Sequence, residues 1–119
     1  MRVIKIEPVR DFPVKSGSNH GTELETTVLK IAQTFGDALV NHPSGDGKSV
    51  YCWMFKCTTE DGTEFGVWLY DYREAHPIRY YDRIRWNIGG ESGEKTDAAG
   101  VALLKALNEP LDSLKFAWH

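Results

Sequence analysis

Cysteine is scarce in this sequence, and long apolar runs are absent from it. The two cysteines, Cys52 and Cys57, are separated by an odd number of positions in one strand-like run. Because alternate residues of a strand point to opposite faces, we expect no disulfide between them. Reduced thiols and the lack of a secretion signal indicate a cytoplasmic protein. No run approaches the ~18 apolar residues of a membrane span, so we expect no membrane segment.

The sequence also lacks an excess of positive charge and lacks histidines at the spacing of metal ligands. Lys and Arg together number 14 against 17 Asp and Glu, which gives a net charge of −3. This balance argues against a nucleic-acid footprint over the whole domain, although it leaves room for a local basic patch. The four histidines are scattered, with no pair at i, i+4 spacing, so we expect no metal site and no cofactor. With 119 residues, the chain fits a single domain spanning residues 1–119.

Aromatic residues, by contrast, are concentrated in three strand-like runs at residues 49–58, 64–72 and 80–88. In each run, both faces of the strand carry bulky side chains. A strand with one face in water alternates apolar with polar residues, so rings on both faces require a second covering surface. A helix layer, another subunit or a ligand would each supply it. Asp61-Gly62 between the first two runs is typical of a hairpin turn, so we expect an antiparallel sheet.

A first helix is predicted after a loop. Residues 10–21 are rich in glycine, proline, serine and asparagine, which is typical of loops. Thr22 and Glu25 then form a capping box, and apolar residues follow at helical spacing until Gly36. We therefore expect a helix over residues 22–36.

A second helix is predicted after a glycine-rich break in the third aromatic run. Ser92 or Thr96 can cap its start, and Asn108 followed by Pro110 ends it. Apolar residues at helical spacing between these limits indicate the side of the helix that faces the core. The predicted inward stripe consists of Val101, Leu104 and Leu107.

Together these elements predict an α+β fold. Residues 2–8 indicate a short strand that Pro8 confines to a sheet edge, and residues 41–48 have the composition of a turn. The predicted order is β-α-β-β-β-α, an antiparallel sheet of three to four strands with two helices packed on one face. The segment that ends at His119 keeps four large apolar side chains. We expect it to pack back on the domain as a short helix or an edge strand.

The strand-to-helix junction at residues 86–93 is the first candidate site. Its glycines allow backbone N–H groups to surround an anion, and the start of the following helix favours negative charge. Basic side chains nearby would add charge-assisted contacts to a phosphorylated nucleotide. Two adjacent glycines are also common in tight turns, which is the structural alternative. The predicted ligand-binding residues are Lys48, Arg83, Arg85, Gly89, Gly90 and Ser92.

The aromatic side chains of the later strands are the second candidate site. Tyr and Trp rings anchor protein partners, and they also stack nucleotide bases. The alternative is that they belong to the core or to the subunit interface of a homodimer. The predicted partner-binding residues are Trp68, Tyr70, Tyr72, Tyr80 and Tyr81.

Support for catalysis is weaker. Asp71 and His76 are the acid-base candidates, but the sequence identifies no nucleophile, base or second carboxylate to act with either. Cys52 and Cys57 lie among aromatic residues, with no clear cation to lower the pKa of their thiols. We therefore predict no catalytic residues and a protein that is not an enzyme.

The chain also combines several short motifs within residues 22–107. They are Phe35-Gly36, Gly45-Asp46-Gly47-Lys48, Trp53, Asp61-Gly62, Tyr70-Asp71-Tyr72-Arg73 and Trp86-Asn87-Ile88-Gly89-Gly90-Glu91-Ser92. Together they resemble small accessory proteins carried by bacteriophages and related mobile elements. The resemblance implies a protein that blocks a host defence component, as anti-CRISPR proteins do. The target would be a host protein or nucleoprotein complex, or a nucleotide signal that is sequestered.

Three hypotheses about function are open at this point. The first is an inhibitor that covers a protein partner, whose basic surface would suit the negative net charge of this chain. The second is a nucleotide-binding protein that holds a phosphorylated signal at the glycine-rich junction, at a homodimer interface. The third is a small hydrolase acting through Asp71 or His76. We favour the first, a small non-enzymatic binding protein.

Overall fold

The structure is a computed structural model that describes residues 1–11, 17–41, 51–71 and 78–118. Within the described residues, no helix is long and apolar enough to cross a membrane. The elements in chain order are β1 (Val3–Val9), β2 (Asn19–Thr26), α1 (Val28–Phe35), β3 (Val40–Asn41), β4 (Tyr51–Thr59), β5 (Glu64–Tyr70), β6 (Ile84–Gly89), α2 (Gly93–Leu107), the 3-10 helix η1 (Leu111–Ser113) and β7 (Leu114–Lys115).

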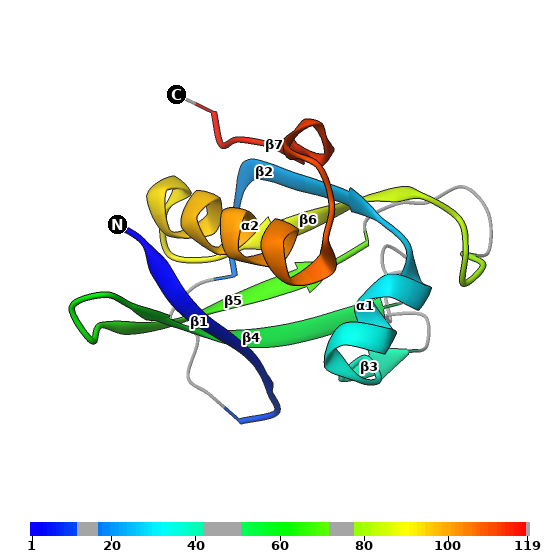
Figure 1. Ribbon diagram of the computed structural model, residues 1–119, viewed down its shortest axis with the longest axis horizontal. Coiled ribbons are helices and arrows are strands. Elements are labelled where there is room, and N and C mark those ends of the chain that lie inside the picture. The colour runs from blue at the N-terminus through cyan, green and yellow to red at the C-terminus, as the bar shows by residue number, and fades with distance from the viewer. Residues whose placement is uncertain (12–16, 42–50, 72–77, 119) are drawn as a thin grey trace.

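The strands form one antiparallel sheet in the order β1-β4-β5-β6-β2-β7, and β3 pairs with β4 (Figure 1). The three predicted aromatic strands are its centre, although the third begins at Ile84 and not at residue 80. The Asp61-Gly62 hairpin is confirmed, since Gly62 has a φ of +87° and the Thr59 N–H donates to the Thr63 carbonyl at 2.9 Å. The α+β class is therefore confirmed. The prediction of three to four strands was too low, because β2, β3 and β7 also join the sheet.

Residues 22–26 of β2 were predicted as the beginning of the first helix and residues 19–21 as the end of a loop, and both predictions were wrong. Thr22, Leu24 and Thr26 are all fully buried and alternate with less buried residues, which is the period of a strand. β2 pairs with β6 on one side and with β7 on the other. Threonine is β-branched and packs well in a pleated surface, so the capping-box pattern was outweighed by these two ladders.

α1 is therefore shorter than expected. Thr27 is its N-cap, and the Thr27 hydroxyl accepts the Lys30 N–H at 3.1 Å. The predicted stop is confirmed, because Gly36 has a φ of +90° and its N–H donates to the Ala32 carbonyl at 2.8 Å. Val28 and Ile31 are the residues that this helix buries in the core.

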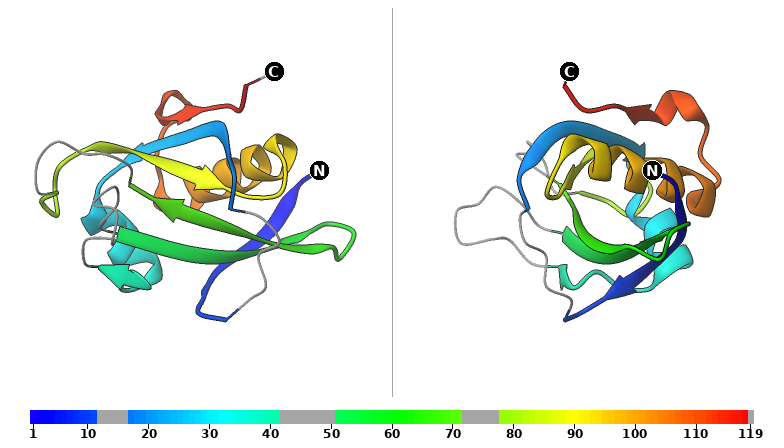
Figure 2. Two further views of the ribbon diagram at one scale, coloured as in Figure 1. Left: turned by 180° about the vertical axis from the view of Figure 1, so that it is seen from behind. Right: turned by 90° about the vertical axis from the view of Figure 1, so that its left-hand side faces the viewer.

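α2 packs along the concave side of the sheet (Figures 1 and 2). It contacts β1 at one edge of the sheet and β2 and β7 at the other edge. Ser92 is the N-cap, as predicted, and Asn108 ends the helix in the left-handed conformation. The buried stripe includes Leu103, whereas the predicted Val101 is 37% exposed. The buried residues recur at i, i+3, i+4 spacing, which assigns Val101 to the outer side of the helix. They are Thr96, Ala99, Gly100, Leu103, Leu104 and Leu107.

The rings that point toward the helices form an enclosed aromatic core. Trp53, Phe55 and Trp86 are each no more than 2% exposed. The two indole rings meet edge to face with centroids 5.6 Å apart. Their polar atoms are satisfied within the core, because Trp53 Nε1 donates to the Gly36 carbonyl and Trp86 Nε1 donates to the Thr26 carbonyl, each at 3.1 Å. For this side of the sheet, the helices supply the second covering surface that the sequence called for.

The C-terminal segment packs back on the sheet, as expected, through η1 and the edge strand β7. Leu114 is buried and pairs with Leu24 of β2. Three of the other apolar side chains of this segment remain largely in solvent. They are Leu111, Phe116 and Trp118.

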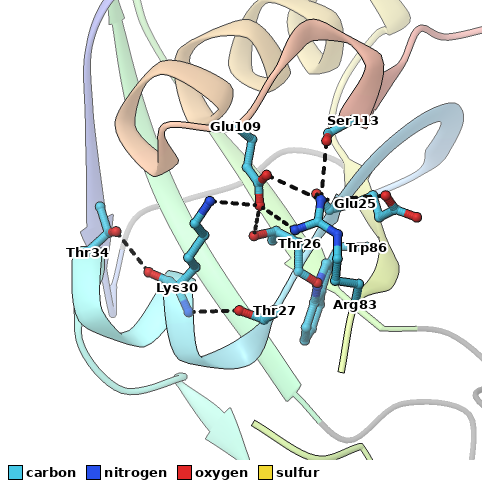
Figure 3. Close-up of polar contacts among 9 residues, drawn as sticks. All are labelled: Glu25, Thr26, Thr27, Lys30, Thr34, Arg83, Trp86, Glu109 and Ser113. Atoms are coloured by element: carbon cyan, nitrogen blue, oxygen red, sulfur yellow. Dashed lines mark hydrogen bonds and ion pairs between the residues drawn. The ribbon is translucent and has the colours of Figure 1, made fainter. Parts of the chain in front are cut away.

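A buried carboxylate joins the end of α2 to β2, α1 and the start of β6 (Figure 3). The Glu109 side chain is 3% exposed. It accepts the Thr26 hydroxyl at 2.7 Å and lies within 3.3 Å of Lys30 Nζ and 3.2 Å of both Arg83 Nη atoms. Burial alone would raise the pKa of Glu109, but the hydrogen bonds from Thr26, Arg83 and Lys30 outweigh it and lower that pKa below its ordinary value.

Candidate functional site

Residues 78–83, here named the tyrosine turn, present two adjacent tyrosines to solvent. Tyr80 is 61% exposed and Tyr81 is 70% exposed. Both were predicted to contact a partner, but as members of a strand, where neighbouring side chains would point to opposite faces. The structure places them in a turn before β6, so both rings are accessible at once.

Hydrogen bonds fix the backbone of the tyrosine turn. The Asp82 N–H donates to the Arg79 carbonyl at 3.1 Å, and the Asp82 carboxylate accepts the Arg79 N–H at 3.0 Å. The same carboxylate lies 3.5 Å from the Arg79 guanidinium. The Tyr80 carbonyl accepts the N–H of Leu29 at 2.9 Å, which satisfies one of the free donors at the start of α1. The turn is therefore closed by the bonds between Arg79 and Asp82, and its backbone is attached to α1.

A pocket of about 270 Å³ lies beside the two exposed tyrosines. It is lined by Tyr51, Ile78, Arg79, Tyr80 and Tyr81. Tyr51 is stacked on Trp53 with ring centroids 6.1 Å apart, so one wall of the pocket is continuous with the aromatic core. Burial, followed by the nearby Tyr80 and Asp71, raises the pKa of Tyr51, so its hydroxyl stays neutral at physiological pH.

The composition of the tyrosine turn suits protein recognition. Tyrosine and arginine are enriched at the energetic centres of interfaces, because they combine large contact area with hydrogen-bonding groups. A backbone that is fixed before binding loses little conformational freedom when a partner docks. The turn can therefore supply two rings, an exposed guanidinium and a pocket to one partner surface.

The other predicted partner-binding residues lie elsewhere. Trp68 and Tyr70 are half-buried on the outer face of β5, away from the helices. Gly17 covers part of the Trp68 ring, since a Cβ at Gly17 would come within 3.1 Å of Trp68 Cδ1. Tyr72 lies outside the described residues. The predicted aromatic set is thus divided between the outer face of β5 and the tyrosine turn.

The glycines of the predicted anion site serve close packing between backbones. A Cβ at Gly89 would lie 2.2 Å from the Gly17 carbonyl oxygen, which no real contact allows. The Gly90 N–H donates to the Ser18 carbonyl at 3.0 Å, and the Gly90 carbonyl contacts His20 Nε2 at 2.9 Å. The Ser92 hydroxyl caps α2 by accepting the Lys95 N–H at 3.2 Å. These groups are engaged within the chain.

The basic residues of the predicted anion site point to separate carboxylates. Arg83 pairs with Glu109 in the buried network, and this hydrogen bonding raises the pKa of its guanidinium. Arg85 Nη1 lies 3.3 Å from Glu23 Oε2. Lys48 lies outside the described residues. Both described cations are thus paired within the chain, and a phosphate at this junction would compete with these carboxylates.

Asp71 and Cys57 are buried, and Cys52 is partly buried. Asp71 is 1% exposed and accepts the Tyr51 N–H at 2.6 Å, so this carboxylate is buried and hydrogen-bonded to the backbone of β4. Burial raises the pKa of both Cys52 and Cys57 to about 12, with Asp71 adding to the effect at Cys52. Both cysteines are free thiols, as predicted. His76, the other acid-base candidate, lies outside the described residues.

The sequence did not single out the exposed rings of Phe116 and Trp118 as a site. Their alternation around a buried Ala117 was the available signal, since residues two apart in an extended segment share a side.

No group of three or more His, Cys, Asp or Glu among the described residues could hold a metal ion.

Comparison with known proteins gives no family to which the chain can be assigned. No family model, no curated protein and no solved structure matches it. The functional argument therefore depends on the geometry of the chain itself.

Proposed function

We propose that the protein is a non-enzymatic inhibitor that covers a protein partner with the tyrosine turn. The observation that carries the proposal is the pair of adjacent, solvent-exposed rings of Tyr80 and Tyr81 on a backbone fixed to α1. Exposing large rings to water is unfavourable, because apolar surface gains free energy when it is buried. A fixed backbone prevents these rings from being buried within the chain itself. A partner surface is the environment that would bury them.

The resemblance to bacteriophage accessory proteins suggests the kind of partner, a component of a bacterial defence system. The negative net charge of −3 suits a basic, nucleic-acid-handling target, because opposite charges accelerate association and favour the correct partner. Arg79, which precedes the two tyrosines and has an exposed guanidinium, would contact an acidic or aromatic group on the partner.

Quantitative capture from a bacterial lysate tests this proposal. Wild-type protein, the double variant Tyr80→Ala/Tyr81→Ala and the control Leu111→Ala would be immobilised in parallel, and the bound proteins counted by mass spectrometry. Leu111 is 64% exposed, which matches the tyrosines, but it lies on η1. We expect at least one protein that binds wild type and the control but not the double variant. Identical protein sets on all three columns would refute the role of the turn.

The affinity for a partner found in this way should depend strongly on the rings. Truncating an interface residue of this kind typically costs about 2 kcal/mol or more, which is roughly a 30-fold increase in Kd per residue. Tyr80→Phe and Tyr81→Phe keep the rings and remove the hydroxyls, so they separate apolar contact from hydrogen bonding. A loss that is complete in the Phe variants would assign the binding energy to the hydroxyls.

Nucleotide sequestration is the alternative that the sequence leaves open, and the internal pairing of Arg83 and Arg85 gives it less support. Calorimetry with cyclic dinucleotides would separate the two proposals. Micromolar or tighter binding that Arg85→Ala weakens would favour sequestration, whereas an absence of heat favours a protein partner. Incubation with the same nucleotides followed by product analysis would test for hydrolysis.

A further inference from the structure

The two ends of the described chain come together at α2. Both ends lie beside the first turns of this helix (Figure 1). Between them is an open groove of about 520 Å³, here named the C-terminal groove. The residues that matter for its chemistry are Met1, Glu94, Asp97, Val101, Phe116 and Trp118.

The secondary structure places these side chains on one side. Glu94, Asp97 and Val101 follow one another at spacings of three and four, so they lie on the same face of α2. Phe116 and Trp118 alternate with Ala117, which is 5% exposed and packs inward. The exposed helix face and the two rings therefore border the same groove.

The extended segment that carries the rings is fastened to the domain. The Ala117 N–H donates to Asp97 Oδ1 at 2.7 Å, and the Thr22 hydroxyl donates to the same oxygen at 2.7 Å. The Trp118 N–H donates to the His20 carbonyl at 2.8 Å. These bonds connect the segment to both α2 and β2.

Two glycines make room for the segment. Gly21 has a φ of +94°, and a Cβ there would come within 2.7 Å of the Trp118 ring. A Cβ at Gly93 would come within 2.9 Å of the Ala117 Cβ. The Trp118 ring is thus seated against the backbone of β2 on one face, yet it remains 67% exposed, and Phe116 remains 45% exposed.

The charged side chains that line the C-terminal groove are of one sign, and the groove is also lined by Met1, which carries the positive amino group of the chain. The charged side chains among its described lining residues are Glu94 and Asp97, both acidic. The neighbouring cations are directed elsewhere, because Lys95 pairs with Glu91 at 2.7 Å and Arg2 pairs with Glu60 at 3.9 Å. A carboxylate in the first turn of a helix is common and stabilises the helix, so Glu94 alone would not define a site. Together with two exposed aromatic rings, the Glu94 carboxylate forms a surface that can bind a cationic side chain.

We propose that the C-terminal groove binds a segment of a partner protein that inserts an arginine or lysine side chain between Trp118 and Glu94. The tryptophan ring attracts the cation through its negative face, and the carboxylate pairs with it. Arginine should be preferred over lysine, because the planar guanidinium stacks on a ring and pairs with a carboxylate at the same time. Apolar residues that flank the basic one would cover Phe116 and Val101. This site is separate from the tyrosine turn and does not depend on it.

Selection from a displayed library of random 12-residue peptides tests the partner chemistry directly. Peptides would be selected on wild-type protein after removal of those that bind the Trp118→Ala variant. We expect the remaining peptides to share an Arg or Lys flanked by apolar residues. Failure to enrich any peptide that requires Trp118, or enrichment of peptides without a basic residue, would overturn the proposal.

Matched variants then measure the cation contact. Glu94→Gln should raise the Kd of an enriched peptide roughly two- to fivefold, as expected for losing an exposed ion pair. Asp37→Asn makes the same change in net charge at an exposed residue beside α1, away from the groove, and should leave the Kd unchanged. Replacing the peptide arginine with citrulline, which is similar in shape but neutral, should cost more than Glu94→Gln, because it removes the charge that both the Trp118 ring and the carboxylate attract. Equal binding of the arginine and citrulline peptides would contradict the proposal.

Two further measurements test where the peptide binds and whether a second copy of the chain occupies the groove. The amide NMR signals of Ala117 and Trp118 should shift on peptide addition in wild-type protein, whereas signals of the tyrosine turn should not. Analytical ultracentrifugation would compare wild type with Trp118→Ala. Self-association that the variant abolishes would show that a second copy of this chain occupies the groove, which would overturn the proposal of a basic partner.

Discussion

Replacing Glu109 tests how the buried ion network holds α2, β2, α1 and the start of β6 together (Figure 3). In Glu109→Ala, the fully buried Thr26 hydroxyl loses the acceptor that lies 2.7 Å away. An unsatisfied buried hydroxyl costs about 1–3 kcal/mol. The Arg83 and Lys30 side chains are 45% and 39% exposed, so water partly replaces their lost partner. Each of these contacts then adds only about 0–1 kcal/mol.

Together these contributions predict that Glu109→Ala lowers the free energy of unfolding by about 3 kcal/mol. With a slope of about 1.5 kcal/mol per molar urea, the unfolding midpoint should fall by about 2 M. Glu109→Gln retains a carbonyl that can accept the Thr26 hydroxyl, so its loss should be about half as large. Glu60→Ala removes a carboxylate with a side chain that is 58% exposed and should be nearly neutral.

The same network predicts a dependence on pH. The pKa of Glu109 is lowered in the folded protein, so its contribution to stability is complete above the unfolded pKa of about 4.3. The contribution is lost as pH falls through the folded pKa. Urea unfolding at pH 6 and at pH 3 should therefore show the difference between wild type and Glu109→Gln shrinking at the lower pH. A Glu109→Ala midpoint equal to that of Glu60→Ala would refute the reasoning.

Three further predictions concern local structure. Gly89→Ala should lower the free energy of unfolding by about 1–3 kcal/mol, because its Cβ meets a backbone oxygen of Gly17; an unchanged urea midpoint would contradict this. Because burial raises the pKa of both Cys52 and Cys57 to about 12, a thiol reagent at pH 8 should label the fully buried Cys57 only after unfolding and the partly buried Cys52 slowly, and rapid native labelling of Cys57 would be inconsistent with the structure. The stabilisation from these protonated thiols is complete below the unfolded pKa of about 8.5 and is lost as pH rises toward 12. Thr27→Ala should cost about 1 kcal/mol through the lost N-cap of α1, while Thr27→Ser retains it.

Local sequence signals were sufficient to predict the structure at positions where only one backbone conformation is possible. The hairpin at Gly62, the α1 stop at Gly36 and the α2 cap at Ser92 all followed from residue types with specific turn or capping chemistry. They were insufficient for β2, where Thr22 and Leu24 fit both a helix start and a buried strand. The pairing of β2 with β6 and β7, which are distant in sequence, decided between these alternatives.

The candidate sites were predictable only in part. Tyr80 and Tyr81 were predicted to contact a partner from their aromatic character, but their joint exposure depends on the Asp82 turn and on the contact with α1. The C-terminal groove depends on Asp97 receiving the Ala117 N–H from a segment that lies beyond the end of the helix. A single sequence contains no direct signal for such a contact.

The stoichiometry of inhibition tests the central claim most directly. A partner obtained through the tyrosine turn would be titrated with the protein by calorimetry, and the activity of that partner would be assayed over the same range. An inhibitor that acts by contact should reach saturation at a fixed molar ratio, with activity lost in proportion to the bound fraction and restored by Tyr80→Ala/Tyr81→Ala. Complete loss of activity at a small fraction of one equivalent would indicate turnover and contradict the account.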